Sequence, residues 1–184
     1  MTIKLLMSGG LDSFVAGLYM KSERNVKAVF IDWGQPTVSQ EKASARYCSH
    51  HLEFPFEIVK IDLCTKNMEI GVNRPGPRVV PGRNKAFIEA IIDDDTSAVV
   101  IGCTKDDFQS YVDCRREYFD TLESELRIKI LTPLIYKTKS EIVGVGKYMP
   151  LHLTWSCYQS EIAHPCGKCS SCNERNFAMS HVRL

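Results

Sequence analysis

A glycine-rich string near the N-terminus combines the residue types that bind phosphate. The string SGGLDS occupies residues 8–13 and follows a short apolar run. Glycine lets the backbone approach a ligand closely, and the start of a following helix offers unpaired N–H groups and a partial positive charge. Ser8 and Ser13 add hydroxyl donors, and Asp12 can cap the helix or help to hold a metal ion. We therefore predict a phosphate-binding loop, against the plainer alternative of a turn capped by Asp12.

Four cysteines near the C-terminus have a spacing typical of a metal site. Cys157, Cys166, Cys169 and Cys172 follow the pattern C-x8-C-x2-C-x2-C. Four thiolates in one short segment can close a tetrahedral zinc site that has no open position, so the zinc would be structural and would hold an otherwise irregular tail. An iron–sulfur cluster is the lesser alternative. A zinc knuckle that binds nucleic acid is disfavoured by the few basic residues in the tail.

Charged and aromatic side chains in the middle of the chain are typical of a ligand site. Arg83 lies just before a predicted helix, where its guanidinium suits a bidentate contact with an anion. The segment 102–115 offers carboxylates and an aromatic ring, and Asp107 or Asp113 is suited to accept hydrogen bonds from a purine-like ring. Trp33 fits a core position and a ligand-stacking position equally well.

The elements that must position these residues alternate between strand and helix. Buried apolar runs predict strands, and helical spacing of apolar residues predicts the helices between them. Such alternation implies a parallel sheet covered by helices on both faces, with ligands bound beyond the carboxyl ends of the strands. The acidic run at 93–95 is expected at a solvated helix end. We predict strands at 3–7, 27–31, 56–61, 98–103 and 128–131, helices at 12–21, 39–51 with Ser39 as N-cap, 85–92, 116–126 and 138–147, and a loop over 63–82.

Length and composition place the chain among single-domain globular proteins. Its 184 residues suffice for one domain, which we expect to comprise residues 1–150 with a tail of residues 151–184 in the same compact unit. A net charge of +1 gives no field that would favour nucleic acid or a membrane surface. The apolar run at the N-terminus is too short for a signal peptide, and no run approaches the roughly 20 apolar residues that span a bilayer. We therefore expect a cytoplasmic protein.

The motifs, in their order along the chain, resemble those of the 7-cyano-7-deazaguanine synthase family, which belongs to the PP-loop ATP pyrophosphatases. The matching strings cover nearly the full length, and the two that end the series are rare outside that family. They are SGGLDS, FIDWGQ, VPGRN, DF-x-x-Y-x-DCR, TPL followed by Lys139 and Glu141, TWSCY and CGKCSSCNER. The resemblance implies a doubly wound, mostly parallel α/β sheet of the PP-loop type with a small zinc-binding tail at the C-terminal end.

The resemblance also implies an activity. PP-loop enzymes cleave ATP between its α and β phosphates and hold the pyrophosphate in the SGGxDS loop. This family acts as an ATP-dependent carbon–nitrogen ligase in queuosine biosynthesis, and converts 7-carboxy-7-deazaguanine and ammonia to 7-cyano-7-deazaguanine through an adenylated acid and an amide. The implied partners are Mg²⁺ with the ATP, one structural zinc per chain and a second copy of the chain in a homodimer, with no membrane or nucleic acid.

The resemblance implies roles for the residues of this chain that stand at matching positions. Catalytic roles fall to Asp12, Arg83 and Lys139. The ATP-binding residues are Ser8, Gly9, Gly10, Leu11, Asp12 and Ser13. The substrate-binding residues are Asp32, Arg83, Asn84, Asp107, Tyr111, Asp113 and Arg115. The zinc ligands are Cys157, Cys166, Cys169 and Cys172.

Three departures from the family pattern lie around the expected substrate pocket. The loop between Leu63 and Arg78 is shorter than in the family, the usual SGYPDCR becomes QSYVDCR at 109–115, and Pro36 and Thr37 replace a basic pair. One alternative is a variant that stops at the amide or joins the activated carboxylate to another amine, even a protein terminus. The others are a tRNA-modifying PP-loop enzyme and a non-catalytic nucleotide-binding module.

Overall fold

A five-stranded parallel sheet forms the centre of the molecule. The structure, a computed structural model, describes residues 1–63, 80–109, 111–158 and 164–181. The strand order is β3-β2-β1-β4-β5, and each neighbouring pair is parallel. The strands are β1 (Thr2–Leu6), β2 (Val26–Asp32), β3 (Phe56–Lys60), β4 (Thr96–Val100) and β5 (Lys129–Leu131). The parallel α/β sheet that the sequence predicts is therefore confirmed.

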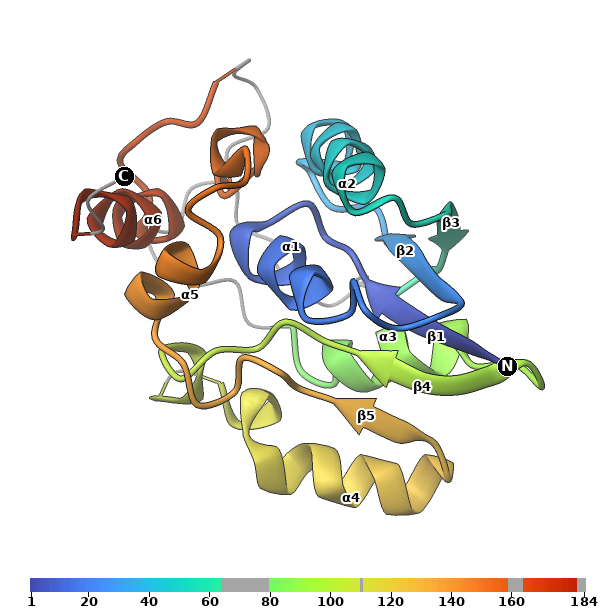
Figure 1. Cartoon of the computed structure of the whole chain (residues 1–184). Coiled ribbons are helices and arrows are strands. Elements are labelled where there is room, and N and C mark those ends of the chain that lie inside the picture. Colours follow the sequence, from blue (N-terminus) through green and yellow to red (C-terminus); the bar gives the residue numbers. More distant parts are fainter. Residues whose placement is uncertain (64–79, 110, 159–163, 182–184) are drawn as a thin grey trace.

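Helices cover both faces of this sheet. Figure 1 shows α1, α2, α5 and α6 on one side and α3 and α4 on the other, in agreement with two separate clusters of buried side chains. The helices are α1 (Leu11–Leu18), α2 (Val38–Leu52), α3 (Arg83–Ile91), α4 (Arg116–Leu126), α5 (Lys139–Val145) and α6 (Ser170–His181). Short 3-10 helices in the connections are η1 (Asp107–Gln109), η2 (Val112–Cys114) and η3 (Leu151–Leu153).

The alternation of side chains along the strands explains the two clusters. Leu5 of β1 is buried with Phe14 of α1 in one cluster, whereas the neighbouring Leu6 belongs to the other cluster with Ile88 of α3. Successive side chains of a strand point to opposite faces, so a strand covered on both sides needs an unbroken apolar run. Burial of side chains such as Phe14 and Ile88 stabilises the fold by roughly 1.5–3 kcal/mol each.

The order of the strands determines where a ligand can bind. The chain runs outward from β1 to β2 and β3, and then returns to the other side of β1 for β4 and β5. The order therefore reverses between β1 and β4, and ligands of such sheets bind beyond the carboxyl ends of the strands at this point. The loop after β4 touches the start of α1 there, because a Cβ on Gly102 would lie 2.8 Å from the carbonyl carbon of Asp12.

The start of α2 differs from the prediction. The helix begins at Val38, and Thr37 rather than Ser39 is its N-cap residue. The Thr37 hydroxyl donates to the Glu41 carboxylate at 2.6 Å, and no side chain caps the helix start. Apolar spacing locates a helix well, but the residue that begins it depends on such local side-chain bonds.

The C-terminal tail is more ordered than the sequence suggests. It was predicted to be irregular, yet it contains α6, whose Ala178 is buried in the cluster that covers α1. Most of the predicted loop at 63–82 lies outside the described residues. Within the described ranges, no helix has the length and apolar character needed to cross a membrane.

Candidate active site

The loop between β1 and α1 is fixed by its surroundings on two sides. Gly9 has a φ of +82°, and a Cβ here would lie 2.5 Å from the Glu41 carbonyl oxygen and 2.7 Å from the Ala45 nitrogen of α2. Glycine alone permits this conformation and this close approach. The Gly9 carbonyl accepts hydrogen bonds from the Ser44 hydroxyl (2.8 Å) and the Trp155 N–H (2.9 Å). The loop is therefore held between α2 and the C-terminal segment.

The loop presents hydroxyl groups at the start of α1. The exposed Ser8 has its hydroxyl 3.1 Å from the hydroxyl of Ser13. The Gly10 N–H donates to the Ser8 hydroxyl (3.2 Å), and the Ser13 hydroxyl donates to the Gly10 carbonyl (3.0 Å). Gly10 is the N-cap residue, so Asp12 does not cap the helix. Hydroxyl groups beside a helix N-terminus favour an anion such as phosphate.

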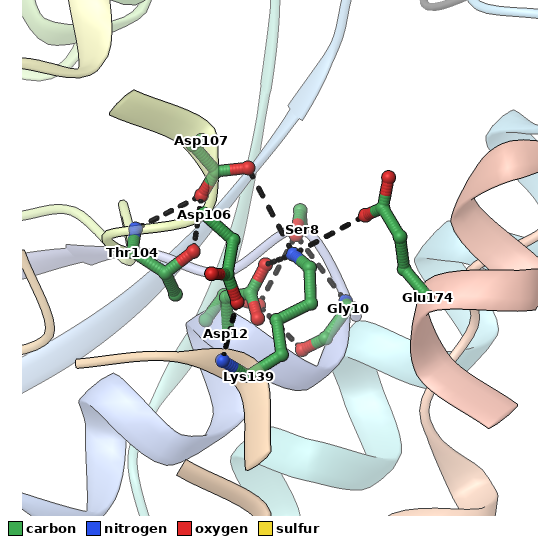
Figure 2. Close-up of polar contacts among 9 residues, drawn as sticks. Ser8, Gly10, Asp12, Thr104, Asp106, Asp107, Lys139 and Glu174 are labelled. Carbon is green, nitrogen blue, oxygen red and sulfur yellow. Dashed lines mark hydrogen bonds and ion pairs between the residues drawn. The ribbon is translucent and has the colours of Figure 1, made fainter. Parts of the chain in front are cut away.

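One ammonium group lies among three carboxylates beside this loop (Figure 2). Lys139 Nζ of α5 is 3.0 Å from Asp12 Oδ2, 3.8 Å from Asp107 Oδ1 and 3.9 Å from Glu174 Oε2. The carboxylates come from α1, from η1 after β4, and from α6. Three carboxylates against one ammonium leave an excess of negative charge in the cluster, which a cation would offset.

Burial and charge act in opposite directions on this cluster. Burial raises the pKa of Asp12, and the charge of Lys139 opposes that rise. Burial disfavours the charged form of Lys139, but the carboxylates of Asp12 and Asp107 outweigh burial and raise the pKa of the lysine above its ordinary range. Asp12 Oδ1 is buried and has no hydrogen-bond partner among the residues that the structure describes. Mg²⁺ prefers carboxylate oxygens as protein ligands, so this oxygen is suited to a divalent cation of that kind.

Local hydrogen bonds fix the backbone that carries the lysine. Thr138 and Glu141 form a capping box at the start of α5, in which the Glu141 carboxylate accepts from the Thr138 N–H at 2.7 Å. The Lys139 N–H donates to the Asp106 carboxylate at 2.7 Å (Figure 2). The sequence Thr-Lys-Ser-Glu therefore begins the helix and aims its lysine toward the loop after β1.

The loop after β1 and the Lys139 cluster border a cavity with a volume of about 500 Å³. Aromatic side chains line another part of this cavity. The Trp33 and Phe87 ring centroids are 6.3 Å apart, and the Arg83 guanidinium lies 5.7 Å from the Phe87 centroid. Tyr111 and Tyr158 also line the cavity. Burial raises the pKa of Tyr111 to about 12, so its hydroxyl keeps its proton at neutral pH. This wall suits a flat heteroaromatic ring that carries an anionic group.

The cavity brings together many of the residues that the sequence assigns to ATP and substrate. The assigned residues that line it are Ser8, Gly10, Asp12, Ser13, Arg83, Asn84, Asp107, Tyr111 and Lys139. The assigned residues outside its lining are Gly9, Leu11, Asp32, Asp113 and Arg115. Gly9 and Leu11 are buried at the base of the loop between β1 and α1.

The other three residues outside the lining make contacts with neighbouring parts of the chain. The Asp32 carboxylate accepts a hydrogen bond from an N–H of the turn after β2 (3.3 Å). The Arg115 guanidinium lies 5.2 Å from the ring centroid of Phe108. The Asp113 carbonyl accepts from the Asn84 amide at 2.9 Å, which orients that amide beside the cavity. Of these three contacts, the one from Asp113 reaches a residue that lines the cavity. The sequence alone could not distinguish such contacts from direct ligand contacts.

The C-terminal segment adds a wall that sequence reasoning missed. Trp155, Tyr158, Ser171 and Glu174 line the cavity. Tyr158 lies in the string TWSCY and Glu174 in the string CGKCSSCNER. Both strings match the family pattern and could have indicated further site residues, but the sequence analysis assigns roles only to their cysteines. Nothing in the residue pattern indicates that this segment returns to the loop after β1.

The four cysteines of the tail converge on one point. The sulfur atoms of Cys157, Cys166, Cys169 and Cys172 all lie within 4.8 Å of one another. Tetrahedral zinc, with Zn–S bonds of about 2.3 Å, needs four thiolates at such spacing. The N–H groups of Lys168 and Cys169 donate to Cys166 Sγ, and they lower the pKa of that thiol to about 6. The donor set therefore fits zinc.

Solved structures share this fold. The predicted subunit of a tRNA methyltransferase from Methanocaldococcus jannaschii aligns with a TM-score of 0.61 and 23% identity, over 80% of this chain and 74% of that chain. The NH3-dependent NAD synthetase from Campylobacter jejuni aligns with a TM-score of 0.53 and 21% identity, over 82% of this chain and 65% of that chain. At these identities the likeness shows the fold alone, which is that of the PP-loop and NAD synthetase group.

Sequence comparison identifies the family. A family model described as "Queuosine biosynthesis protein QueC" matches residues 2–183. The 7-cyano-7-deazaguanine synthase of Prochlorococcus marinus strain AS9601 is 35% identical over 212 residues, which cover 96% of this chain and 92% of the relative. The enzyme of the same name from Picrophilus torridus is 35% identical, over 91% of this chain and 82% of the relative. The chain therefore belongs to the 7-cyano-7-deazaguanine synthase (QueC) family.

Proposed function

We propose that this chain converts 7-carboxy-7-deazaguanine and ammonia to 7-cyano-7-deazaguanine with two molecules of ATP. The carboxylate attacks the α-phosphorus of ATP, an acyl adenylate forms and pyrophosphate leaves. Ammonia then displaces AMP and gives the amide. The amide oxygen attacks a second ATP, and its departure as part of AMP, with loss of two protons from nitrogen, leaves the nitrile. Relatives that cover most of the chain are named for this product, which supports the proposal.

The observation that carries the proposal is a single cavity that joins a phosphate-binding loop to an aromatic wall. Ser8 and Lys139 line one part, and Trp33 and Arg83 line another. ATP needs the first set of groups, and a deazaguanine ring with a carboxylate needs the second. Adenylation requires the α-phosphate and the carboxylate to meet in line, so positioning and charge neutralisation supply most of the rate.

We assign the β- and γ-phosphates of ATP to the loop at residues 8–13. The N–H groups at the start of α1 and the hydroxyls of Ser8 and Ser13 would bind the pyrophosphate as it leaves. Lys139 reaches the same region and would neutralise the charge that develops on the α-phosphate. Mg²⁺ bound with ATP supplies further charge neutralisation, and the buried Oδ1 of Asp12 would hold it.

We place the deazaguanine ring against the aromatic wall. Trp33 and Phe87 offer stacking surface, and the Arg83 guanidinium beside them suits a bidentate contact with the substrate carboxylate. Asn84 and Tyr111 would bind the polar edge of the ring from the same wall. The Asp113 carbonyl would hold the Asn84 amide in place, and Asp32 and Arg115, which lie outside the lining, would act on the substrate only through other residues.

We also propose one structural zinc per chain at the four cysteines, which would tie residues 151–184 to the domain of residues 1–150 in one compact unit. The convergence of the sulfur atoms and the packing of α6 against α5 support this arrangement. By family membership we further propose a cytoplasmic homodimer that takes part in queuosine biosynthesis and does not bind nucleic acid.

Product analysis tests the proposed reaction. The purified protein would be incubated with 7-carboxy-7-deazaguanine, ATP, Mg²⁺ and ammonium, and the products identified by mass spectrometry, with a parallel reaction that lacks ammonium. We expect the nitrile, with two molecules of AMP for each nitrile. The amide as the sole product would instead assign a variant that stops after the first half of the reaction. Absence of substrate-dependent AMP would overturn the proposal.

A further inference from the structure

Glu174 is the third carboxylate of the cluster around Lys139, and it comes from the cysteine-bearing tail rather than from the sheet. It lies in α6, two residues after Cys172, and lines the cavity. Its carboxylate is 3.9 Å from Lys139 Nζ, and its side chain is 56% exposed. Figure 2 shows it on the opposite side of the lysine ammonium group from Asp107. The roles proposed above for phosphate, metal and ring binding do not use it.

The other two carboxylates of the cluster are held more tightly. Asp12 Oδ2 accepts a hydrogen bond from Lys139 at 3.0 Å. Asp107 Oδ2 accepts from the N–H (2.9 Å) and from the hydroxyl (2.7 Å) of Thr104. Glu174 makes the longest of the three contacts with Lys139, and more than half of its side chain faces solvent. A small cation that enters the cavity therefore meets Glu174 more readily than the other two.

The amide-forming step needs a place for such a cation. Amines are mostly protonated near neutral pH, whereas attack on an acyl adenylate requires the unprotonated amine. The cationic Lys139 and Arg83 suit phosphate and carboxylate but repel an ammonium ion. We propose that Glu174 binds the incoming ammonium ion and positions its nitrogen for attack on the adenylate; this inference rests on the function proposed above.

The proposed step balances without any further reactant. The bound ammonium ion loses one proton to water beside Glu174 and becomes ammonia. The nitrogen lone pair forms a bond to the carbonyl carbon of the acyl adenylate, and the bond from that carbon to the AMP oxygen breaks. AMP leaves with the electron pair, and the nitrogen releases a second proton to water. The products are the amide and AMP.

The cysteine cluster and one arginine anchor α6 on both sides of Glu174. Cys172 Sγ lies 3.8 Å from the Ser156 hydroxyl of the segment that lines the cavity. Arg175 donates a hydrogen bond to the Leu151 carbonyl at 2.6 Å. The helix turn that carries Glu174 is therefore held between two fixed points. In this arrangement the cysteines position the carboxylate, and the carboxylate contacts the nucleophile.

Separate assays of adenylation and of amine use test the proposal. ATP–pyrophosphate exchange in the presence of 7-carboxy-7-deazaguanine reports adenylation without ammonium, and the KM for ammonium chloride reports the second step. We expect Glu174→Gln to raise the KM for ammonium about tenfold or more, the usual size for loss of a charge-assisted contact, and to lower the exchange rate by a clearly smaller factor, because the variant also loses the contact with Lys139. Glu117→Gln changes an exposed carboxylate of α4 and should leave both values unchanged.

Hydroxylamine supplies a readout that a purely structural role would not move. It is largely uncharged at neutral pH, so Glu174→Gln should use it nearly as well as the unaltered protein does. Equal impairment with hydroxylamine and ammonium, an unchanged KM for ammonium, or an equally large fall in pyrophosphate exchange would each overturn the role of Glu174. Absence of substrate-dependent exchange in the unaltered protein would instead count against the proposed function itself.

Discussion

Each end of the parallel sheet holds a lysine paired with an aspartate, and the two pairs differ in how fully their polar atoms are satisfied. At the amino end, Lys4 Nζ donates to the Asp93 carboxylate and to the Ile91 carbonyl, both at 2.7 Å. At the carboxyl end, Lys139 faces three carboxylates, and Asp12 keeps a buried oxygen that no described residue contacts through a hydrogen bond.

The difference separates the part of the molecule that stabilises the fold from the part that serves chemistry. A lysine–aspartate pair whose polar atoms already have hydrogen-bond partners gains little from a ligand. A cluster with an unpartnered buried oxygen and excess negative charge is stabilised when a ligand supplies the missing contacts. Violations of local polar satisfaction are expected at functional sites. Changes at the amino end should therefore alter stability alone, and changes at the carboxyl end should alter catalysis.

The largest effect is expected at the cysteine tail, which has no counterpart at the amino end. Cys169→Ser removes one of four convergent thiolates, and zinc binding to such a set contributes on the order of 10 kcal/mol. The variant should lose most of its zinc and unfold at a clearly lower temperature. Metal analysis and thermal unfolding would measure both, with the exposed Lys168→Ala as control. A stable, fully loaded Cys169→Ser would remove Cys169 from the ligand set.

A substitution in the loop between β1 and α1 should have the next largest effect. Gly9→Ala places a methyl group 2.5 Å from the Glu41 carbonyl oxygen and requires an unfavourable φ, so we expect a loss of about 3 kcal/mol or more in the free energy of unfolding. Gly34→Ala is the matched control, because its φ is +81° with open space around it, and it should cost about 1–2 kcal/mol. Urea unfolding of both variants measures the difference. Equal losses would show that the close approach at Gly9 is unimportant.

Removal of the lysine at the carboxyl end should affect catalysis far more than stability. Lys139→Met keeps the length of the side chain but removes its charge, so adenylation should slow about 100-fold or more. The protein should still fold, because Asp12 can take up a proton when its partner is lost. ATP–pyrophosphate exchange and thermal unfolding would measure the two properties. Exchange at the unaltered rate would contradict the assignment of Lys139 to the α-phosphate.

The matching change at the amino end should give the reverse result. Lys4→Met leaves the Ile91 carbonyl without its buried donor and should lower the free energy of unfolding by about 1–2 kcal/mol. Pyrophosphate exchange should stay as it is in the unaltered protein, because Lys4 lies at the far end of the sheet from the cavity. A large loss of exchange in a folded Lys4→Met protein would break the separation between the two ends.

The smallest expected effect is a pH dependence at the amino end. Hydrogen bonds from Lys4 and Thr96 lower the pKa of Asp93 to about 2, from an ordinary value of 3.8. A depressed pKa stabilises the folded state above the ordinary value, and this stabilisation is lost as the pH falls through about 2. Asp93→Asn should therefore flatten the fall in melting temperature between these values. Asp12→Asn should not flatten this fall in melting temperature, because burial raises the pKa of Asp12 and its contribution to stability changes with pH in the opposite direction.

The sequence predicts the carboxyl end better than the amino end. The SGGLDS string and Lys139 stand in short motifs whose chemistry can be recognised without the fold, and the structure places both at one cavity. By contrast, the run at 93–95 is exposed beyond the end of α3, as predicted, but the sequence does not reveal that Asp93 also accepts from the buried Lys4. Nothing around Lys4 marks it as buried, because its partner is 89 positions away and meets it only through tertiary packing.

The tail shows a different limit of prediction from sequence. Within α6, Cys172 and Ala178 are the buried residues, so an apolar stripe is nearly absent and the helix was not predicted. Convergent cysteines and a few hydrogen bonds anchor it instead. The role inferred for Glu174 depends on that placement, and the spacing of the cysteines alone does not reveal which side chain of the helix enters the cavity.

Transfer of a carboxylate oxygen to AMP is the most direct signature of adenylation in this cavity. The measurement is mass spectrometry of AMP formed from 7-carboxy-7-deazaguanine that carries oxygen-18 in both carboxylate positions. We predict AMP with one heavy oxygen from each half of the reaction, and therefore two labelled AMP molecules for each nitrile. Unlabelled AMP would show that ATP is cleaved by water rather than by the substrate, and would contradict the proposed reaction.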